Sequence, residues 1–209
     1  MKYFKFSTLA EAHESIVQHL YWNHEVKETE DGESCWFGEP ITMEILEPHY
    51  HNIHPASPHR QRCLIYADHL INGTPGDFTY DYHDRLFETP LNQIDYMISK
   101  LKSSANTRRA IAVTWRPDID TKSNEVPCLQ YIQCVINNGK LDFFVLFRSE
   151  DMVGGFGPNA FGLEAIMQMI SNKTKIPMGR YIHTVISPHV YFIRDKTEIA
   201  NLAGYNYAK

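Results

Sequence analysis

Hydrophobic residues recur at helical spacing in four stretches of the chain. The clearest is residues 91–102, where apolar side chains fall at positions i, i+3, i+4 and i+7: Ile94, Met97, Ile98 and Leu101. We expect helices in three further segments with a similar pattern: residues 7–23, residues 63–72 up to Gly73, and a stretch after Asn159 whose inner face holds Phe161, Leu163, Ile166, Met167 and Ile170.

Alternation of hydrophobic and polar residues predicts the strands. Residues 130–136 and 141–147 both alternate, and Asn137-Asn138-Gly139 between them is a turn sequence, so this segment is predicted to be a β-hairpin. Shorter strands are expected at residues 34–46, 109–115, 180–186 and 190–193. This mixed order of helices and strands predicts an α+β fold, with a mainly antiparallel or mixed sheet backed by helices.

The composition is that of a globular protein. The chain has 209 residues, of which 43% are hydrophobic and 22% charged. This predicts one domain over residues 1–209, whose core needs neither a disulfide nor a metal. The net charge is −5, so the basic field that duplex nucleic acid requires is missing, while a local pocket for one small anion stays open.

Location and partners follow from what the chain lacks. No apolar run approaches the ~18–20 residues of a membrane span, so we expect no membrane partner. The net charge of −5 argues against a specific nucleic acid as a partner. No secretion signal is visible, and the four cysteines are therefore expected to be reduced thiols in the cytoplasm.

Cys128 is the thiol with chemically useful neighbours. It stands at the start of the predicted hairpin, and a tight hairpin brings it next to Arg148 and Ser149 at the other end. A guanidinium lowers a neighbouring thiol's pKa from about 8.5, and an arginine with a hydroxyl is a good phosphate grip. The alternatives are a buried, inert Cys128 and an Arg148 that forms a surface salt bridge with Glu150 or Asp142.

Two further segments carry side chains suited to a nucleoside. A glycine-rich stretch, residues 154–157, leads to Asn159, which either caps the following helix or reads a planar ring through its amide. His189 and Tyr191 are two residues apart and share one face of a strand. They can hold a sugar hydroxyl there, or they are ordinary half-buried strand residues.

Two other clusters also have simple structural alternatives. The pair Arg108-Arg109 precedes a strand and indicates a sheet edge or subunit boundary, unless it is only a solvated basic pair. Residues 49–59 hold four histidines. Their prolines and the lack of nearby cysteine ligands argue against a formed site, so we expect a solvated loop and no metal.

Several of these motifs together resemble the thymidylate synthase family. They occur in the family's order and at compatible spacing: Asn106-Thr107-Arg108-Arg109, Trp115, Pro127-Cys128-Leu129-Gln130, Phe147-Arg148-Ser149-Glu150-Asp151, Asn159 and His183…His189-Val190-Tyr191. The Pro-Cys-Leu-Gln form and the short chain look like the archaeal or phage-like branch. The same fold also serves pyrimidine-nucleotide hydroxymethylases.

The resemblance implies a thymidylate synthase-like fold and a homodimer that holds deoxyuridylate beside the cosubstrate 5,10-methylenetetrahydrofolate. For the nucleotide it implies Cys128 as the nucleophile, Arg148 and Ser149 on the phosphate together with Arg108 and Arg109 of the partner subunit, Asn159 on the pyrimidine edge, His189 and Tyr191 on the 3′ hydroxyl, and Gln130 in support. For the folate and the proton it implies Asp151 at the pterin, Tyr80 near the proton that leaves C5, and Asp68 on the helix that carries the family's acid–base glutamate.

Departures from the family pattern concentrate around folate and hydride handling. The usual histidine after the cysteine is Leu129, the glutamine before the phosphate arginine is Phe147, and Lys27 is a candidate for the phosphate-loop arginine. Methyl transfer giving thymidylate is the leading prediction, and a hydroxymethylase, in which water captures the same adduct, is the alternative. Two further classes are a thiol hydrolase using Cys128 with His183 or His189, and a nucleotide-binding module without turnover.

Overall fold

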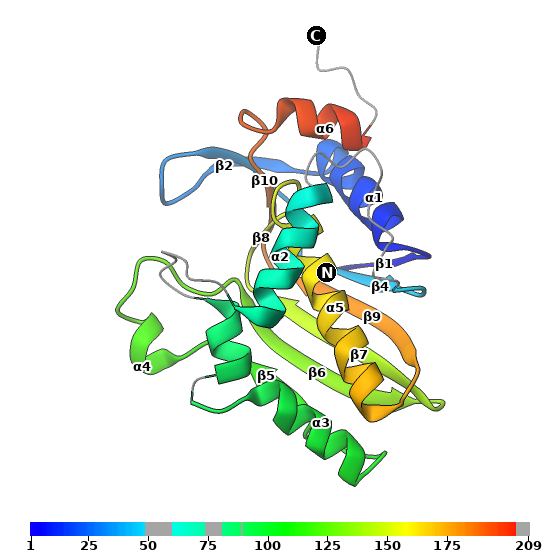
Figure 1. Cartoon of the computed structure of the whole chain (residues 1–209). Coiled ribbons are helices and arrows are strands. Elements are labelled where there is room, and N and C mark those ends of the chain that lie inside the picture. The colour runs from blue at the N-terminus through cyan, green and yellow to red at the C-terminus, as the bar shows by residue number, and fades with distance from the viewer. Residues whose placement is uncertain (49–59, 74–80, 89, 204–209) are drawn as a thin grey trace.

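A computed structural model describes residues 1–48, 60–73, 81–88 and 90–203. Within these residues, six strands form a mixed sheet in the order β1-β4-β9-β7-β6-β5 (Figure 1). The pairs β1–β4 and β9–β7 are parallel, and the other neighbours are antiparallel. The strands are β1 (Lys2–Phe6), β4 (Ile41–Ile45), β5 (Ile111–Val113), β6 (Leu129–Asn137), β7 (Lys140–Phe147) and β9 (Met178–Val185).

A second, four-stranded sheet has the order β2-β3-β10-β8. Its strands are β2 (Glu25–Glu28), β3 (Ser34–Phe37), β8 (Glu150–Asp151) and β10 (Pro188–Val190). The single strand expected at residues 34–46 is therefore wrong, because β3 and β4 belong to different sheets. Gly38 and Pro40 explain the break: a Cβ at Gly38 would lie 2.3 Å from the side chain of Leu20, and Pro40 has no amide hydrogen for a ladder.

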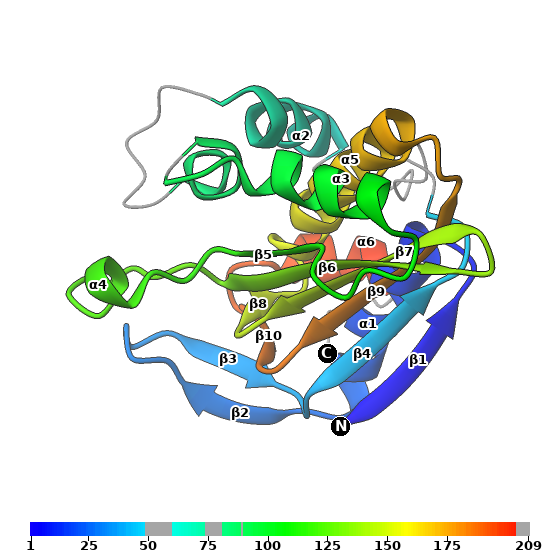
Figure 2. The ribbon, with the colours of Figure 1, turned by 90° about the horizontal axis from the view of Figure 1, so that it is seen from below.

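Helices cover one face of the larger sheet. Figure 2 shows α2 (Arg60–Asn72), α3 (Gln93–Ser103) and α5 (Phe156–Thr174) together above β5, β6 and β7. The remaining helices are α1 (Leu9–Trp22), the π-helical turn η1 (Asp84–Glu88), the single turn α4 (Pro117–Asp120) and α6 (Lys196–Ala203). The α+β prediction is confirmed, although β1, β2, β8, η1, α4 and α6 lay outside it. No helix in the described ranges is both long and apolar enough to cross a membrane.

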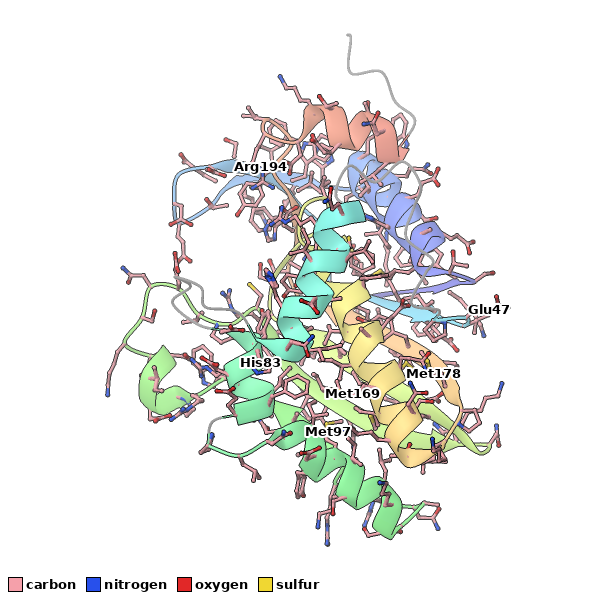
Figure 3. All side chains as sticks on the ribbon, viewed as in Figure 1. Glu47, His83, Met97, Met169, Met178 and Arg194 are labelled. Atoms are coloured by element: carbon pink, nitrogen blue, oxygen red, sulfur yellow. The ribbon has the colours of Figure 1, made fainter. Side chains whose placement is uncertain are left out.

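The end of α2 illustrates how a glycine positions an element. Gly73 has φ +77°, a left-handed conformation that L side chains rarely adopt, and its amide donates to the carbonyl of His69. A Cβ at Gly73 would also lie 2.9 Å from the ring of His83. His83, labelled near one end of α2 in Figure 3, hydrogen-bonds the Leu70 carbonyl at 3.2 Å. The helix thus ends where the sequence predicts.

The predicted hairpin is formed by β6 and β7. Asn138 and Gly139 at its tip have φ +50° and +74°, the left-handed pair that a tight two-residue hairpin turn requires. At the opposite end the Arg148 amide donates to the Cys128 carbonyl at 2.9 Å. The predicted meeting of Cys128 with residues 148–149 is therefore present in the structure.

Candidate active site

A cavity of about 970 Å³ opens where the hairpin ends meet α2, α5, β8 and β10. Its size suits a nucleotide-sized or larger ligand. Seven residues singled out in the sequence lie on its wall: Cys128, Arg148, Ser149, Asp151, Asn159, His189 and Tyr191. The tertiary structure thus gathers side chains from four separate segments of the chain into one site.

Cys128 is the accessible thiol of this site. It is half-buried, whereas the other three cysteines are buried. Burial raises the pKa of Cys35 and of Cys63 to about 11, which leaves those thiols protonated and unreactive at neutral pH. The backbone amides of Cys128 and Leu129 donate to the Tyr82 hydroxyl at 3.1 and 2.9 Å, and this contact fixes the start of β6 at the cavity.

Arg148 is anchored to the segment that precedes Cys128. Its Nε donates to the Pro127 carbonyl at 3.0 Å and its Nη2 to the Val126 carbonyl at 2.9 Å. The alternative of a surface salt bridge is wrong, because Asp142 pairs with Arg180 and Glu150 with His183. The guanidinium is exposed and keeps further N–H donors for an anion.

Ser149 and His189 meet through the pairing of two short strands. β8 runs parallel to β10, and the Ser149 Oγ lies 3.3 Å from Nδ1 of His189. Tyr191 packs edge-on against the His189 ring, with centroids 5.2 Å apart. The Arg194 guanidinium covers the Tyr191 ring at 4.2 Å. These hydroxyl and imidazole groups form a polar wall that can bind a sugar or phosphate.

Asn159 lies inside α5, so the prediction that the helix begins after it is wrong. The helix starts at Phe156 with Gly155 as its N-cap, and Asn159 is therefore not a cap residue. Its side chain instead joins two groups on the cavity wall. The Tyr66 hydroxyl donates to Oδ1 at 2.8 Å, and Nδ2 donates to Oε1 of Glu150 at 2.9 Å.

Asp151 is held in a fixed turn at the edge of the cavity. Its Oδ1 accepts from the amides of Val153 and Gly154 at 3.0 and 3.1 Å, and its Oδ2 accepts from Arg194 at 2.5 Å. Arg194 is labelled in Figure 3. Gly155 completes the turn, because a Cβ there would lie 2.9 Å from the Asp151 carbonyl oxygen. Oδ2 of Asp151 can still accept from a ligand.

Four predicted residues are not part of this wall. Asp68 is exposed and accepts from Asn72 at 2.8 Å, since it lies roughly a third of a turn from the side of α2 that faces the cavity. Its proposed acid–base role has no support in this placement. Gln130 donates to the Pro127 carbonyl at 2.5 Å, outside the cavity. Arg108 and Arg109 are exposed just before β5.

Three further expectations concern Tyr80, the histidine segment and Lys27. Tyr80 and the histidine segment 49–59 lie outside the described residues. Lys27 pairs with Glu25 at 2.5 Å and does not line the cavity. The residues that follow Lys27 contribute Glu28, Glu30 and Asp31 to the cavity wall, and their negative charges repel a phosphate. Arg62 and Arg148 supply positive charge to the described wall, and the part at Arg148 is termed its basic end.

Among the wall residues that the sequence analysis missed, three make hydrogen bonds at the site: Tyr66, Tyr82 and Glu150. For Tyr66 a signal was present, because the α2 residues on the wall recur at helical spacing: Arg62, Ile65, Tyr66, His69 and Leu70. Glu150 had been considered only as a partner for Arg148. Within the ranges that the structure describes, no group of three or more His, Cys, Asp or Glu is placed to hold a metal ion.

An accessible thiol, an anchored arginine and the Asn159 amide around one cavity define the class of site. It is suited to covalent chemistry on a small phosphorylated ring compound. The sequence model of the family described as thymidylate synthase matches residues 60–202. The chain belongs to the thymidylate synthase family.

Relatives are found in archaea and bacteria. A Methanocaldococcus jannaschii protein named "Putative thymidylate synthase" is 38% identical over 202 residues, 91% of each chain. A Methanosarcina barkeri protein of the same name is 38% identical over 151 residues, 70% of each chain. The "Thymidylate synthase" of Bacillus subtilis subsp. natto is 34% identical over 101 residues, 48% of this chain and 36% of its own. Family membership implies a one-carbon transferase that acts on a pyrimidine nucleotide.

Proposed function

We propose that this protein transfers a one-carbon unit from a reduced folate to C5 of deoxyuridylate and forms thymidylate. The observation that carries the proposal is the placement of Cys128 on the cavity wall together with Arg148, Ser149 and Asn159. Each matches the family motif that was read from the sequence. The names of the relatives support the same reaction.

In this proposal Cys128 supplies the nucleophile. Its thiolate adds to C6 of the uracil ring, and the electron pair of the C5–C6 bond moves toward C4–O4, which makes C5 nucleophilic. After C5 has bonded to the one-carbon unit, a base removes the C5 proton. The bond from the one-carbon unit to the folate nitrogen then breaks, a hydride from the folate reaches that carbon, and loss of the Cys128 sulfur from C6 regenerates the thiolate and the C5–C6 double bond. Arg148 lies on the same cavity wall as Cys128.

The other wall residues bind and orient the nucleotide. Arg148 and Ser149 bind the phosphate, because the Arg148 guanidinium keeps N–H donors for an anion at the basic end of the cavity. His189 and Tyr191 receive the 3′ hydroxyl. The Asn159 amide accepts from uracil N3–H and donates to O4, using the capacity that Tyr66 and Glu150 leave.

The rest of the cavity fits a second planar ligand. The volume of the whole cavity, about 970 Å³, lies near the upper end of the ~300–1,000 Å³ that is typical of single-ligand sites. Apolar groups of Phe37, Ile65, Leu70 and Val126 line the cavity. Asp151 is placed to accept a ring N–H. Bound there, 5,10-methylenetetrahydrofolate supplies the one-carbon unit and, for a methyl product, the hydride.

We also propose a homodimer with a shared phosphate site. Over β5, β6 and β7, the face of the larger sheet away from α2, α3 and α5 carries apolar side chains: Ile111 and Val113 are 36% and 45% exposed, and Val113 registers with Tyr131, which registers with Leu146. Over β9 and β4 the same face carries Thr184 and Thr42. A second copy covering this face would remove these side chains from water. Arg108 and Arg109 precede the same strand and would reach the partner's phosphate site.

A hydroxymethylase is the second candidate. Its support is the polarity of the cavity wall, which includes Glu30, His69 and Glu125, side chains that can hydrogen-bond water. A thiol hydrolase is less well supported, because His183 is fully buried between Glu150 and Tyr181, and His189 contacts Ser149. Neither imidazole is hydrogen-bonded to Cys128 among the described contacts.

The test is product mass. Purified protein is incubated with deoxyuridylate and methylenetetrahydrofolate, and we expect thymidylate; 5-hydroxymethyldeoxyuridylate would instead identify the hydroxymethylase. In parallel, 5-fluorodeoxyuridylate with the same folate should give a covalent ternary adduct. Peptide mapping should place the adduct on Cys128, with the other three cysteines of the same sample as internal controls. No adduct and no product from any pyrimidine nucleotide would contradict the proposed function.

A further inference from the structure

Behind the Asn159 amide lies a chain of buried hydrogen bonds. The Tyr181 hydroxyl is 2.7 Å from Nδ1 of His183, and Nε2 of His183 is 2.7 Å from Oε2 of Glu150. The other oxygen of Glu150, Oε1, accepts from Nδ2 of Asn159 at 2.9 Å. Tyr181 and His183 are fully buried and Glu150 is 2% exposed. This series of hydrogen bonds begins in the core and ends on the cavity wall.

The direction of every hydrogen bond in this chain can be assigned. Burial raises the pKa of Tyr181 well above its usual value, and its hydroxyl donates to Nδ1 of His183. Nε2 of the His183 ring then carries the proton that is donated to Glu150. The Glu150 carboxylate only accepts, and the group of Asn159 that faces it must therefore be the NH₂.

We propose that Glu150 fixes the orientation of the Asn159 amide and thereby makes this site select uracil over cytosine nucleotides. The inference rests on the proposed function, in which Asn159 reads the base. With NH₂ toward Glu150, the amide presents its second N–H and its oxygen to the cavity in fixed positions. The N–H then donates to O4 of uracil, and the oxygen accepts from N3–H. In cytosine the same positions carry an amine, which is a donor, and a bare N3, which is an acceptor, so neither hydrogen bond forms.

A flipped amide would match cytosine, and Glu150 is the group that prevents the flip. Rotation would place Oδ1 of Asn159 against an acceptor-only carboxylate and leave a buried charge with one partner fewer. Tyr66 at the other end imposes no such constraint, because a hydroxyl can donate or accept. Glu150 is therefore a positioning and specificity residue that acts through Asn159.

The substitution Glu150→Gln tests the proposal. His183 still donates, so the oxygen of the introduced glutamine faces His183 and its NH₂ faces Asn159. This favours the flipped amide. Isothermal titration with deoxyuridylate and with deoxycytidylate, without folate, gives the ratio of the two dissociation constants. We expect the preference for deoxyuridylate to fall by about tenfold or more, or to invert, the scale of one hydrogen bond to a charged group.

Two control variants separate this effect from general damage. Glu164→Gln changes another fully buried glutamate, which has no hydrogen-bond partner in the described structure and does not line the cavity, so the ratio should stay unchanged. Tyr66→Phe removes the donor to Oδ1 but leaves Glu150, and the ratio should stay within about threefold. If Glu150→Gln fails to fold, Tyr66→Phe still decides: loss of the preference there would assign the orientation to Tyr66 and overturn the proposal.

The unmodified protein provides the reference. If it binds neither nucleotide, or binds both equally, the proposed function and this inference fail together. If it prefers deoxyuridylate and folded Glu150→Gln retains that preference unchanged, the role of Glu150 is overturned while the proposed function stands. A reduced or inverted ratio confined to Glu150→Gln supports the proposal.

Discussion

The reactive residues of this site depend on neighbours that hold them in place. Cys128 is one of four thiols, yet it is the one that combines partial exposure with a place on the cavity wall. Tyr82 fixes its backbone amide, and the anchored guanidinium of Arg148 lies on the same wall. Chemistry at the residue scale is thus set by a few hydrogen bonds to backbone groups.

The first prediction concerns the nucleophile. Cys128→Ser should lower turnover of deoxyuridylate by about a thousandfold or more, because a neutral alcohol is a far weaker nucleophile than a thiolate. Nucleotide affinity by isothermal titration should change little. Cys134→Ala, buried in β6, which begins one residue after Cys128, serves as the control and should affect only stability. Substantial turnover by Cys128→Ser would remove Cys128 from the mechanism.

The second prediction concerns base choice. Asn159→Asp places a carboxyl beside Glu150, and the like charge favours its protonated form. A protonated carboxyl can donate to cytosine N3 and accept from its amine, so kcat/KM should shift toward deoxycytidylate. The measurement is kcat/KM for both nucleotides in the unmodified protein and the variant. An unchanged ratio would show that Asn159 does not read the base.

At the scale of elements, a buried ion pair joins segments that flank the site. Nη2 of Arg85, in η1, donates to Oδ1 of Asp120 at 2.7 Å, and the Arg116 amide donates to Oδ2 at 2.6 Å. Arg85 also donates to the Thr114 carbonyl at 3.1 Å. Burial alone would raise the pKa of Asp120, but the hydrogen bonds from Arg85 and Arg116 outweigh it and lower the pKa. The pair therefore ties η1 to α4 and the end of β5.

The third prediction follows from this pKa. Asp120→Asn should lower the free energy of unfolding by about 3–5 kcal/mol at pH 7, because it leaves Arg85 buried without its charge partner. A carboxyl with a lowered folded-state pKa stabilises the fold above its unfolded value of about 3.9, and this contribution is lost as the pH falls through the folded value. Urea unfolding at several pH values should thus show the two proteins converging in acid.

A matched control for this prediction is Asp118→Asn. Asp118 is exposed and pairs with Arg116 at 3.2 Å across the surface. Its loss should change the free energy of unfolding by less than about 1 kcal/mol. Equal effects of the two substitutions would contradict the role given to the buried pair.

At the scale of the whole molecule, arginines connect the cavity with the open face of the larger sheet. Arg148 supplies one arginine to the basic end of the cavity, while Arg108 and Arg109 lie exposed beside the apolar strands of the other face. If a second copy packs on that face, each chain completes its partner's phosphate site. Association and substrate binding would then be coupled.

The fourth prediction tests this coupling. Arg109→Ala and Cys128→Ser chains should each be inactive or nearly so as homodimers. A mixture that has exchanged subunits should regain up to about a quarter of the unmodified activity, since one site of each heterodimer holds both an intact Cys128 and the partner's Arg109. Subunit exchange is followed by native mass spectrometry. No recovery in an exchanged mixture would contradict the shared site.

Local patterns in the sequence were sufficient for the elements that are stabilised locally. The hairpin, α3 and the end of α2 follow from a turn pair, a hydrophobic period and a glycine. The meeting of Cys128 with Arg148 follows from hairpin geometry. Local pattern failed at residues 34–46, because the break between β3 and β4 depends on the close approach of Gly38 to Leu20 in α1, a contact between distant segments.

Only the tertiary structure decided which side of each element faces the cavity. The sequence placed a candidate carboxylate on α2, but the packing of α2 against α5 turns Tyr66 toward the site and Asp68 toward solvent. Glu150 and His183 are 33 residues apart in the chain and meet because β8 and β9 bring them together in the core. Residue types and their spacing thus determined the chemistry that the chain can perform. The orientation of those groups came from long-range packing, because burial and hydrogen-bond partners depend on segments that no local pattern connects.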